Sequence, residues 1–87
     1  MKYETKHEIN SGTYASGASK TFTFTYGNNI SNIRNIYLTS ANYTANGGYM
    51  FIDAITISGN VLTVTVTNGY NSSGTPNMFL IATVATY

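Results

Sequence analysis

Residues 63–84, TVTVTNGYNSSGTPNMFLIATV, contain two apolar runs with a polar loop between them. Val64 and Val66 alternate with threonines, and this period of two is typical of a half-buried β-strand. The loop over residues 68–76 is longer than the two residues that a tight hairpin needs, and it contains a tyrosine flanked by Gly and Asn. We therefore predict two strands joined by a loop that presents side chains and does more than connect the strands.

The same period of two extends over the rest of the chain, and turn-forming Gly, Asn and Ser residues separate the runs. The Ser-Gly-Asn sequence at residues 58–60 predicts a tight hairpin, and residues 10–19 predict a long loop. Apolar residues on both faces of the run at 49–57 predict a central strand. The expected strands are residues 1–9, 19–26, 35–44, 49–57, 61–67 and 77–87. We predict an all-β fold, a six-stranded antiparallel β-sandwich that forms a single domain over residues 1–87.

The first predicted strand has its charges on one side. The charged side comprises Lys2, Glu4, Lys6 and Glu8, and the other side comprises Met1, Tyr3, Thr5, His7 and Ile9. We expect the charged side to be the outer face and the other side to be half buried. The alternating signs suit cross-strand ion pairs or an edge that is protected against aggregation.

Composition favours self-association. Charged residues make up 8% of the chain, against about 25% in an ordinary soluble domain, and a net charge of +1 gives little repulsion between copies. A domain of this size hides only roughly 60 to 65% of its unfolded surface, and the chain has no cysteine for a disulfide or a zinc array. Oligomerisation is the remaining support for a marginal core. An ordinary neutral, Thr-rich β surface is the alternative.

Several partner classes are disfavoured. Four Lys or Arg residues do not form the basic face that nucleic-acid binding needs. No apolar run approaches the roughly 18 residues of a membrane span, and residues 1–9 lack the apolar stretch of a signal peptide. We expect a soluble chain without nucleic acid, membrane insertion or a targeting segment.

Groups for catalysis or metal binding are scarce. Glu4 and Glu8 lie four residues apart on a strand, roughly 13 Å, which is too far for glycoside hydrolysis. His7 is the single histidine, and we expect it to be packed or to lie in an interface. No nucleophile motif accompanies His7 and Asp53, and one chain has too few zinc ligands, although a site on a threefold axis from three copies of His7 or Asp53 stays open. We predict no catalytic residue and no cofactor.

Three stretches together resemble the H-type lectin-like domains at the tips of phage tail fibres: TFTF at 21–24, ISGNVLTVTVTNG at 57–69 and NMFLIATVATY at 77–87. The resemblance covers roughly residues 20–87, and it departs from the family in having Phe79 where a Trp is common and no proline in GNNISNIRNIY. It implies a sandwich that assembles as a homotrimer on a virion tail or similar appendage and binds ligands in clefts between subunits.

Tyrosines near loops are the expected ligand contacts. The chain has eight tyrosines and no tryptophan, and a tyrosine ring offers a flat apolar face with a hydroxyl group at low entropic cost. Sugars present C–H faces and hydroxyl groups, which suit Tyr beside Asn. The candidates are Tyr70 with Asn68 and Asn71, and Tyr43 and Tyr49 around Asn46. Packing in a trimer interface is the alternative for each tyrosine.

Arg34 and Asp53 are charges that stand alone in apolar or amide-rich sequence. Asp53 alternates in phase with Phe51 and Ile55, so a buried carboxylate there needs a partner, and Arg34 offers a bidentate one. We expect a salt bridge between them, within or between subunits. Contact with sugar hydroxyl groups is the alternative.

These observations favour a non-enzymatic module that binds a host-surface glycan or bacterial cell-surface polysaccharide. Three sites in a trimer add avidity. A purely structural virion protein, such as a capsid decoration or tail accessory subunit that binds other virion proteins, is the second hypothesis. An enzyme is the least favoured, because no group is poised for proton transfer or nucleophilic attack.

Overall fold

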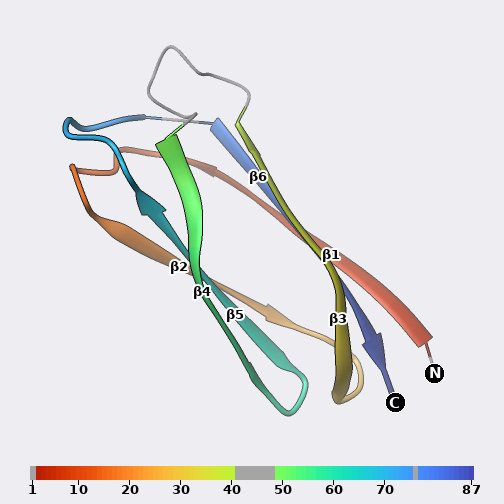
Figure 1. Ribbon diagram of the computed structural model, residues 1–87. Coiled ribbons are helices and arrows are strands. Elements are labelled where there is room, and N and C mark those ends of the chain that lie inside the picture. The colour runs from red at the N-terminus through yellow and green to blue at the C-terminus, as the bar shows by residue number, and fades with distance from the viewer. Residues whose placement is uncertain (1, 41–48, 76) are drawn as a thin grey trace.

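The computed structural model describes residues 2–40, 49–75 and 77–87. Within them the chain is all-β, with six strands in two three-stranded antiparallel sheets (Figure 1). The strands are β1 (Lys2–Ser11), β2 (Ser19–Thr25), β3 (Ile30–Ser40), β4 (Met50–Ser58), β5 (Val61–Asn68) and β6 (Asn77–Thr86). The sheet orders are β1-β6-β3 and β2-β5-β4. The predicted all-β fold of six antiparallel strands is confirmed.

The two strands of the segment 63–84 are the central strands of the two sheets. β5 pairs with β2 and β4, and β6 pairs with β1 and β3. The loop between β5 and β6 therefore connects the middle of one layer to the middle of the other. It lies at the end of the molecule opposite the two termini (Figure 1).

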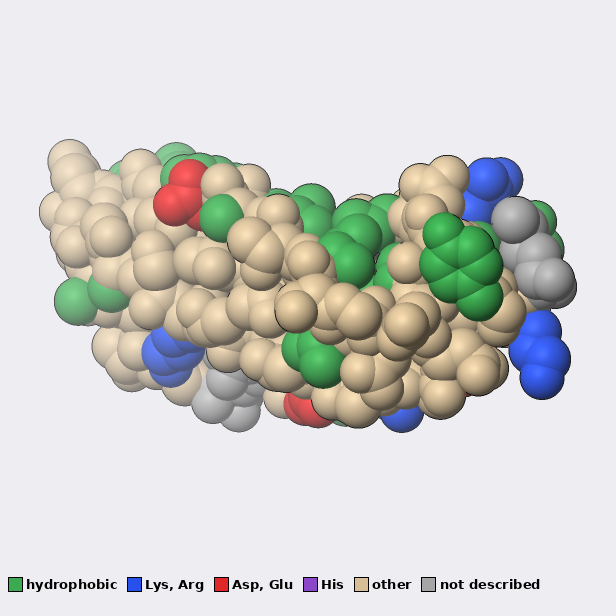
Figure 2. All heavy atoms as spheres, turned by 90° about the horizontal axis from the view of Figure 1, so that it is seen from below, with side chains coloured by type: hydrophobic (Ala, Val, Ile, Leu, Met, Phe, Trp, Pro, Cys, Tyr) green, Lys and Arg blue, Asp and Glu red, His purple; other side chains and the backbone are tan. Residues whose placement is uncertain are grey.

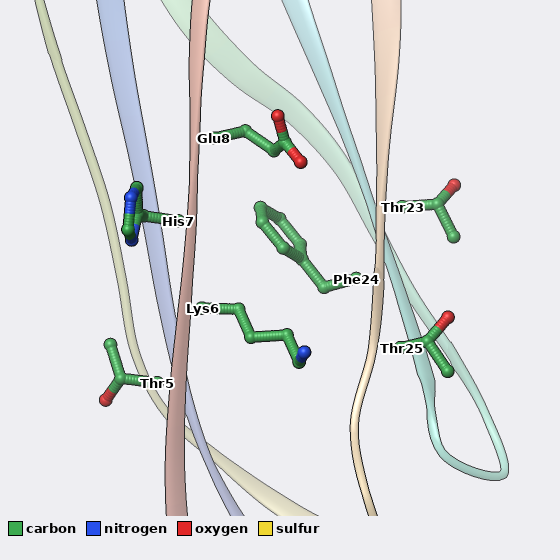
Figure 3. Close-up of a pocket in the computed structure, with 7 residues that line it drawn as sticks. All are labelled: Thr5, Lys6, His7, Glu8, Thr23, Phe24 and Thr25. Carbon is green, nitrogen blue, oxygen red and sulfur yellow. The ribbon is translucent and has the colours of Figure 1, made fainter.

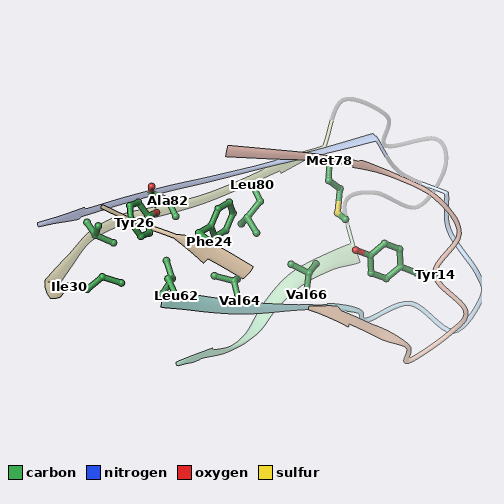
Figure 4. Packing of buried hydrophobic residues seen from close by; sticks show 11 residues of the cluster. Tyr14, Phe24, Tyr26, Ile30, Leu62, Val64, Val66, Met78, Leu80 and Ala82 are labelled. Atoms are coloured by element: carbon green, nitrogen blue, oxygen red, sulfur yellow. Dashed lines mark hydrogen bonds between the residues drawn. The ribbon is translucent and has the colours of Figure 1, made fainter. Parts of the chain in front are cut away.

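The core lies between the two sheets (Figure 4). Alternation on the central strands supplies most of it. Buried side chains from the first layer include Met78, Leu80, Ala82 and Val84, and those from the second include Phe24, Leu62, Val64 and Val66. The threonines of β5 alternate with these residues, so Leu62, Val64 and Val66 form one face of the strand. Hydrophobic burial on this face stabilises the packing of the two layers.

The orientation predicted for β1 is wrong. Its charged residues Glu4, Lys6 and Glu8 pair with Val84, Ala82 and Leu80 and so lie on the core side of the sheet. Tyr3 and Ile9 are on the outer side and are 64% and 59% exposed. The reason is that β1 is an edge strand and a pocket opens between it and β2, so Lys6 and Glu8 on the core side still reach water.

β3 begins at Ile30, five residues before the predicted start, and includes part of a sequence that resembles a loop. Its first part was not predicted as a strand because the register shifts between Ile30 and Asn32 and between Ile33 and Asn35 interrupt the alternation. Each irregularity changes the alternation, so that Ile30, Ile33 and Ile36 all reach the core at a spacing of three residues. A spacing of three does not fit the period of two that predicts a strand, so the first part of β3 was not predicted.

β4 is an edge strand, although its apolar residues on both faces predicted a central one. A register shift between Ile52 and Ala54 places the extra residue at Asp53. Beyond it, Ile55 and Ile57 pair with core residues of β5 and lie on the core side, yet they remain 42% and 44% exposed. The edge position leaves these isoleucines covered on one side only.

The predicted hairpin at residues 58–60 is confirmed, because β4 and β5 pair from Ser58 and Val61 around a turn with Gly59 at a φ of 60°. The predicted loop at 10–19 is partly strand, since β1 continues to Ser11. Tyr14 in that loop is fully buried, and its backbone forms a bridge with Gly74. None of the described segments is a helix long and apolar enough to cross a membrane.

Candidate functional site

Two of the tyrosines predicted to contact a ligand stack on each other. Tyr49 directly precedes β4 and Tyr70 follows β5, and their ring centroids lie 4.2 Å apart at an interplanar angle of 24°. The backbone N–H of Gly69 donates to the carbonyl oxygen of Tyr49 at 3.0 Å, which extends the β4–β5 ladder by one step. Tyr49 is 50% exposed. The pair therefore presents aromatic surface to solvent.

Phe51 extends this aromatic surface. A methyl group in place of the Gly69 hydrogen would lie 3.1 Å from Phe51 Cε1 and 3.1 Å from the Tyr49 carbonyl oxygen. Because Gly69 has no side chain, the Phe51 ring can lie close to the backbone of Gly69. We call Tyr49, Phe51 and Tyr70 the aromatic platform.

Asn68, also predicted to contact a ligand, is the last residue of β5, and its side chain lies among the backbones of the two neighbouring loops. Its side chain is fully buried, and Nδ2 lies 3.0 to 3.3 Å from the carbonyl oxygens of Tyr14, Ala15 and Ser72. Its Oδ1 accepts a hydrogen bond from the backbone N–H of Tyr70 at 3.0 Å. Because its polar atoms are used within the protein, Asn68 positions Tyr70 and is not itself on the surface.

The loop after β5 is also fastened from the segment between β1 and β2. Ser16 Oγ donates to the carbonyl oxygen of Tyr70 at 2.8 Å, and the backbones of Tyr14 and Gly74 exchange hydrogen bonds of 2.8 and 3.0 Å. The loop therefore holds Tyr70 in a defined place, as a presenting loop requires. Asn71 is exposed next to Tyr70. Tyr43 and Asn46 lie outside the described residues.

Asp53 and Arg34 do not pair with each other within the chain, so that expectation is wrong there. They are on different sheets: Asp53 is on β4, and its Oδ2 accepts a hydrogen bond from Thr67 Oγ1 at 3.1 Å. Arg34 is on β3, with its guanidinium carbon 5.7 Å from the centroid of the Tyr3 ring, within the range of a cation–π contact. The bulge at Asp53 explains the error, because it turns the carboxylate outward instead of burying it.

A row of hydroxyl groups adjoins the aromatic platform on the outer face of the β2-β5-β4 sheet. Thr67 is the register partner of Phe51, and Ser19 Oγ lies 2.6 Å from Thr67 Oγ1. Since Thr67 donates its proton to Asp53, Ser19 donates to Thr67. Farther along the sheet, Thr21 and Thr65 are hydroxyl neighbours at 3.5 Å. Sequence reasoning missed this face, although the alternate threonines at 21–25 and 63–67 are its signal.

A pocket lies between β1 and β2, and it is lined by Thr5, Lys6, His7, Glu8, Thr23, Phe24 and Thr25 (Figure 3). Lys6, Glu8 and Phe24 point into the gap, whereas His7 points away on the far side of β1 (Figure 3). His7 therefore does not face Lys6 and Glu8 across the gap. Within the described part of the chain, no three His, Cys, Asp or Glu side chains gather as a metal site requires.

Tyr26 is buried near the same edge. Its hydroxyl donates to the carbonyl oxygen of Ala82 at 2.7 Å. Burial raises the pKa of Tyr26, and the negative charge of Glu4 adds to the increase. Glu4 Oε1 accepts a hydrogen bond from the backbone N–H of Gly27 at 3.3 Å. These contacts join β1 to the end of β2 and belong to the scaffold.

Comparison with known proteins gave no match. The chain matches no protein-family model, no curated protein and no solved structure. The resemblance to H-type lectin-like domains therefore stays a prediction, and the candidate site is assigned from its own geometry.

The face drawn in Figure 2 is largely uncharged. Charged side chains appear on it as separate small patches, and hydrophobic side chains gather in a hollow (Figure 2). This distribution agrees with the low charge content of the sequence. Recognition by such a surface depends on stacking and neutral hydrogen bonds more than on long-range electrostatic attraction.

Proposed function

We propose that this protein is a non-enzymatic binding module for a glycan or a bacterial cell-surface polysaccharide. The stack of Tyr49 on Tyr70 is the observation that supports the proposal, because it presents aromatic surface beside the start of β4 and the end of β5. The apolar C–H face of a sugar ring packs on such a surface, as other apolar groups do on aromatic rings.

Neighbouring polar groups suit the hydroxyl groups of a sugar. Asn71 beside the platform offers an amide, and Asp53 offers an exposed carboxylate on the same sheet face, held by the hydroxyl group of Thr67. The platform comes from one chain. We therefore expect each copy to bind weakly by itself, with avidity from an oligomer on a phage tail fibre or similar appendage, as the resemblance implies.

The test is binding of the labelled 87-residue protein to an array of bacterial cell-wall polysaccharides and common glycans. Tyr70→Ala removes one ring of the platform. Tyr37→Ala is the matched control, since Tyr37 is also exposed but lies on the other sheet. Saturable binding that Tyr70→Ala loses and Tyr37→Ala keeps supports the proposal. In folded samples, no saturable binding or equal binding by both variants contradicts it.

One observation favours the second candidate, a structural virion protein. The outer face of the β1-β6-β3 sheet has exposed apolar side chains on all three strands: Tyr3, Ile9, Tyr37 and Phe79. Such a face suits burial against other proteins. The two candidates differ in a simple way, because a purely structural subunit attaches to a larger particle and binds no glycan.

A further inference from the structure

β1 has a free edge. Of the described strands, β1 pairs with β6 along its full length, and its other side has no strand partner. Ten residues of backbone are therefore available to pair with another extended strand. Exposed edges of this kind are the places where sheets add strands from other chains.

The charges on β1 make this edge complementary to a second copy of itself. Antiparallel partners lie on the same face, so the charged residues must meet one another if the two sheets are continuous. When Thr5 faces Thr5 of the second copy, Lys2 faces Glu8 and Glu4 faces Lys6. Every charge on the strand then has an opposite charge directly across from it.

Other registers lack this match. A shift of two residues toward the N-terminus places Lys2 opposite Lys6 and Glu4 opposite Glu4. A shift of two in the other direction places Glu4 opposite Glu8 and Lys6 opposite Lys6. Shifts of four leave only two attractive pairs, and odd shifts place charged residues on the face that contains Tyr3 and Ile9. Like charges directly opposite destabilise a sheet, so the pattern selects one register.

We propose that β1 pairs antiparallel with β1 of a second copy about a twofold axis at Thr5. The two three-stranded sheets then form one continuous sheet in the order β3-β6-β1-β1-β6-β3. Charges of one sign would protect this edge in every register that keeps the two charged faces together, because like charges would then lie opposite each other. The alternation of signs on β1 does the opposite.

Glu4 supplies an independent observation. Its Oε1 accepts a hydrogen bond from Gly27, but its Oε2 is buried and has no hydrogen-bond partner among the described residues. A buried carboxylate oxygen without a donor is unfavourable. In the proposed register the residue across from Glu4 is Lys6 of the second copy, whose ammonium group is the kind of donor that Glu4 lacks.

The proposal predicts a dimer, which differs from the trimer that the family resemblance implies. Its test uses single-sign edges in the full chain. Glu4→Lys with Glu8→Lys makes the edge wholly positive, and Lys2→Glu with Lys6→Glu makes it wholly negative. The matched control exchanges all four signs, Lys2→Glu, Glu4→Lys, Lys6→Glu and Glu8→Lys, which keeps the same number of attractive pairs.

Sedimentation equilibrium at low ionic strength measures the mass, with circular dichroism to establish folding. We expect the native chain and the four-site control to reach twice the 9.4 kDa monomer mass as concentration rises. Each single-sign variant stays monomeric, and an equimolar mixture of the two forms dimers. A native chain that is monomeric or trimeric overturns the proposal. Single-sign variants that associate as the native chain does overturn it as well.

Discussion

Tyr49 and Tyr70 stack with ring centroids 4.2 Å apart because the N–H of Gly69 donates to the carbonyl oxygen of Tyr49 and adds a step to the β4–β5 ladder. The hairpin at Gly59 brings together two residues that are distant in sequence. The aromatic platform therefore depends on the register of a rigid hairpin and on the loop that follows it.

Gly69 is the position where the platform is most sensitive to added volume. Gly69→Ala places a methyl group 3.1 Å from Phe51 Cε1 and from a backbone oxygen, so the rings must shift. We expect a loss of stability of about 1 kcal/mol and weaker glycan binding. Thr56→Ala, at an exposed position farther along β4, is the control and should change neither. Urea unfolding and array binding measure the two effects, and unchanged binding by Gly69→Ala would contradict the assignment of the platform.

Asn68 should matter more for stability than its neighbour Asn71. Asn68→Ala leaves the N–H of Tyr70 and the carbonyl oxygen of Ser72 without their partner, and it removes one of the two donors to the carbonyl oxygens of Tyr14 and Ala15. We expect a loss of about 2 kcal/mol or more in the free energy of unfolding, since each unsatisfied buried group costs about 1 to 3 kcal/mol. Asn71→Ala removes an exposed side chain and should cost less than about 0.5 kcal/mol. Similar losses for the two variants in urea would disprove the role of Asn68.

The core should respond as a two-layer structure. Leu62 is fully buried on β5, and Leu62→Ala should cost about 2 to 5 kcal/mol. Ile57 is its register partner on β4 and lies on the same face, but it is partly exposed. Ile57→Ala should therefore cost clearly less. Equal effects in thermal unfolding would mean that another subunit covers the edge of β4.

Tyr26 should make stability depend on alkaline pH. The pKa of Tyr26 is raised in the folded state, so the folded protein holds this proton more tightly than the unfolded chain does. Its contribution is complete below the unfolded value of about 10 and is lost as pH rises through the higher folded value. Tyr26→Phe should remove that part of the loss. Unfolding free energies measured at about pH 8 and pH 11 compare the two proteins, and identical pH dependence would contradict the prediction.

β5 and β6 were predictable as strands because their apolar residues alternate regularly, but their central places in the sheets were not, since the run at residues 49–57 was expected to be the central strand. The errors in the predictions for β1, β3 and β4 have local structural causes. Register shifts interrupt the alternation of side chains in β3 and β4. Because of them, β3 was predicted to start too late, and Asp53 was expected on the same face as Phe51 and Ile55. The two faces of β1 were predicted the wrong way round, because a charged strand face can point toward the core when the strand is at the edge of a sheet.

The candidate site was predictable in part. Tyrosines beside loops were the predicted ligand contacts, and two of them meet in the structure, while their contact with a ligand stays a prediction. Which tyrosines meet depends on how the strands pair, and strand pairing could not be read from a single sequence. Asn68 and Tyr14 also lie in loop sequence, yet both are buried because the two loops pack on each other. The polarity of an asparagine does not predict whether its amide is exposed to a ligand or is buried and hydrogen-bonded within a loop.

The most direct test of the proposed function is a set of binding isotherms on the polysaccharide with the highest array signal. It compares the native chain with Tyr49→Ala, Tyr70→Ala and the control Tyr37→Ala, each shown to be folded. We predict saturable binding by the native chain and the control, and a loss of roughly tenfold in affinity, about 1.4 kcal/mol, for each platform variant. Native-like affinity in both platform variants, or an equal loss in Tyr37→Ala, would show that the ligand binds elsewhere.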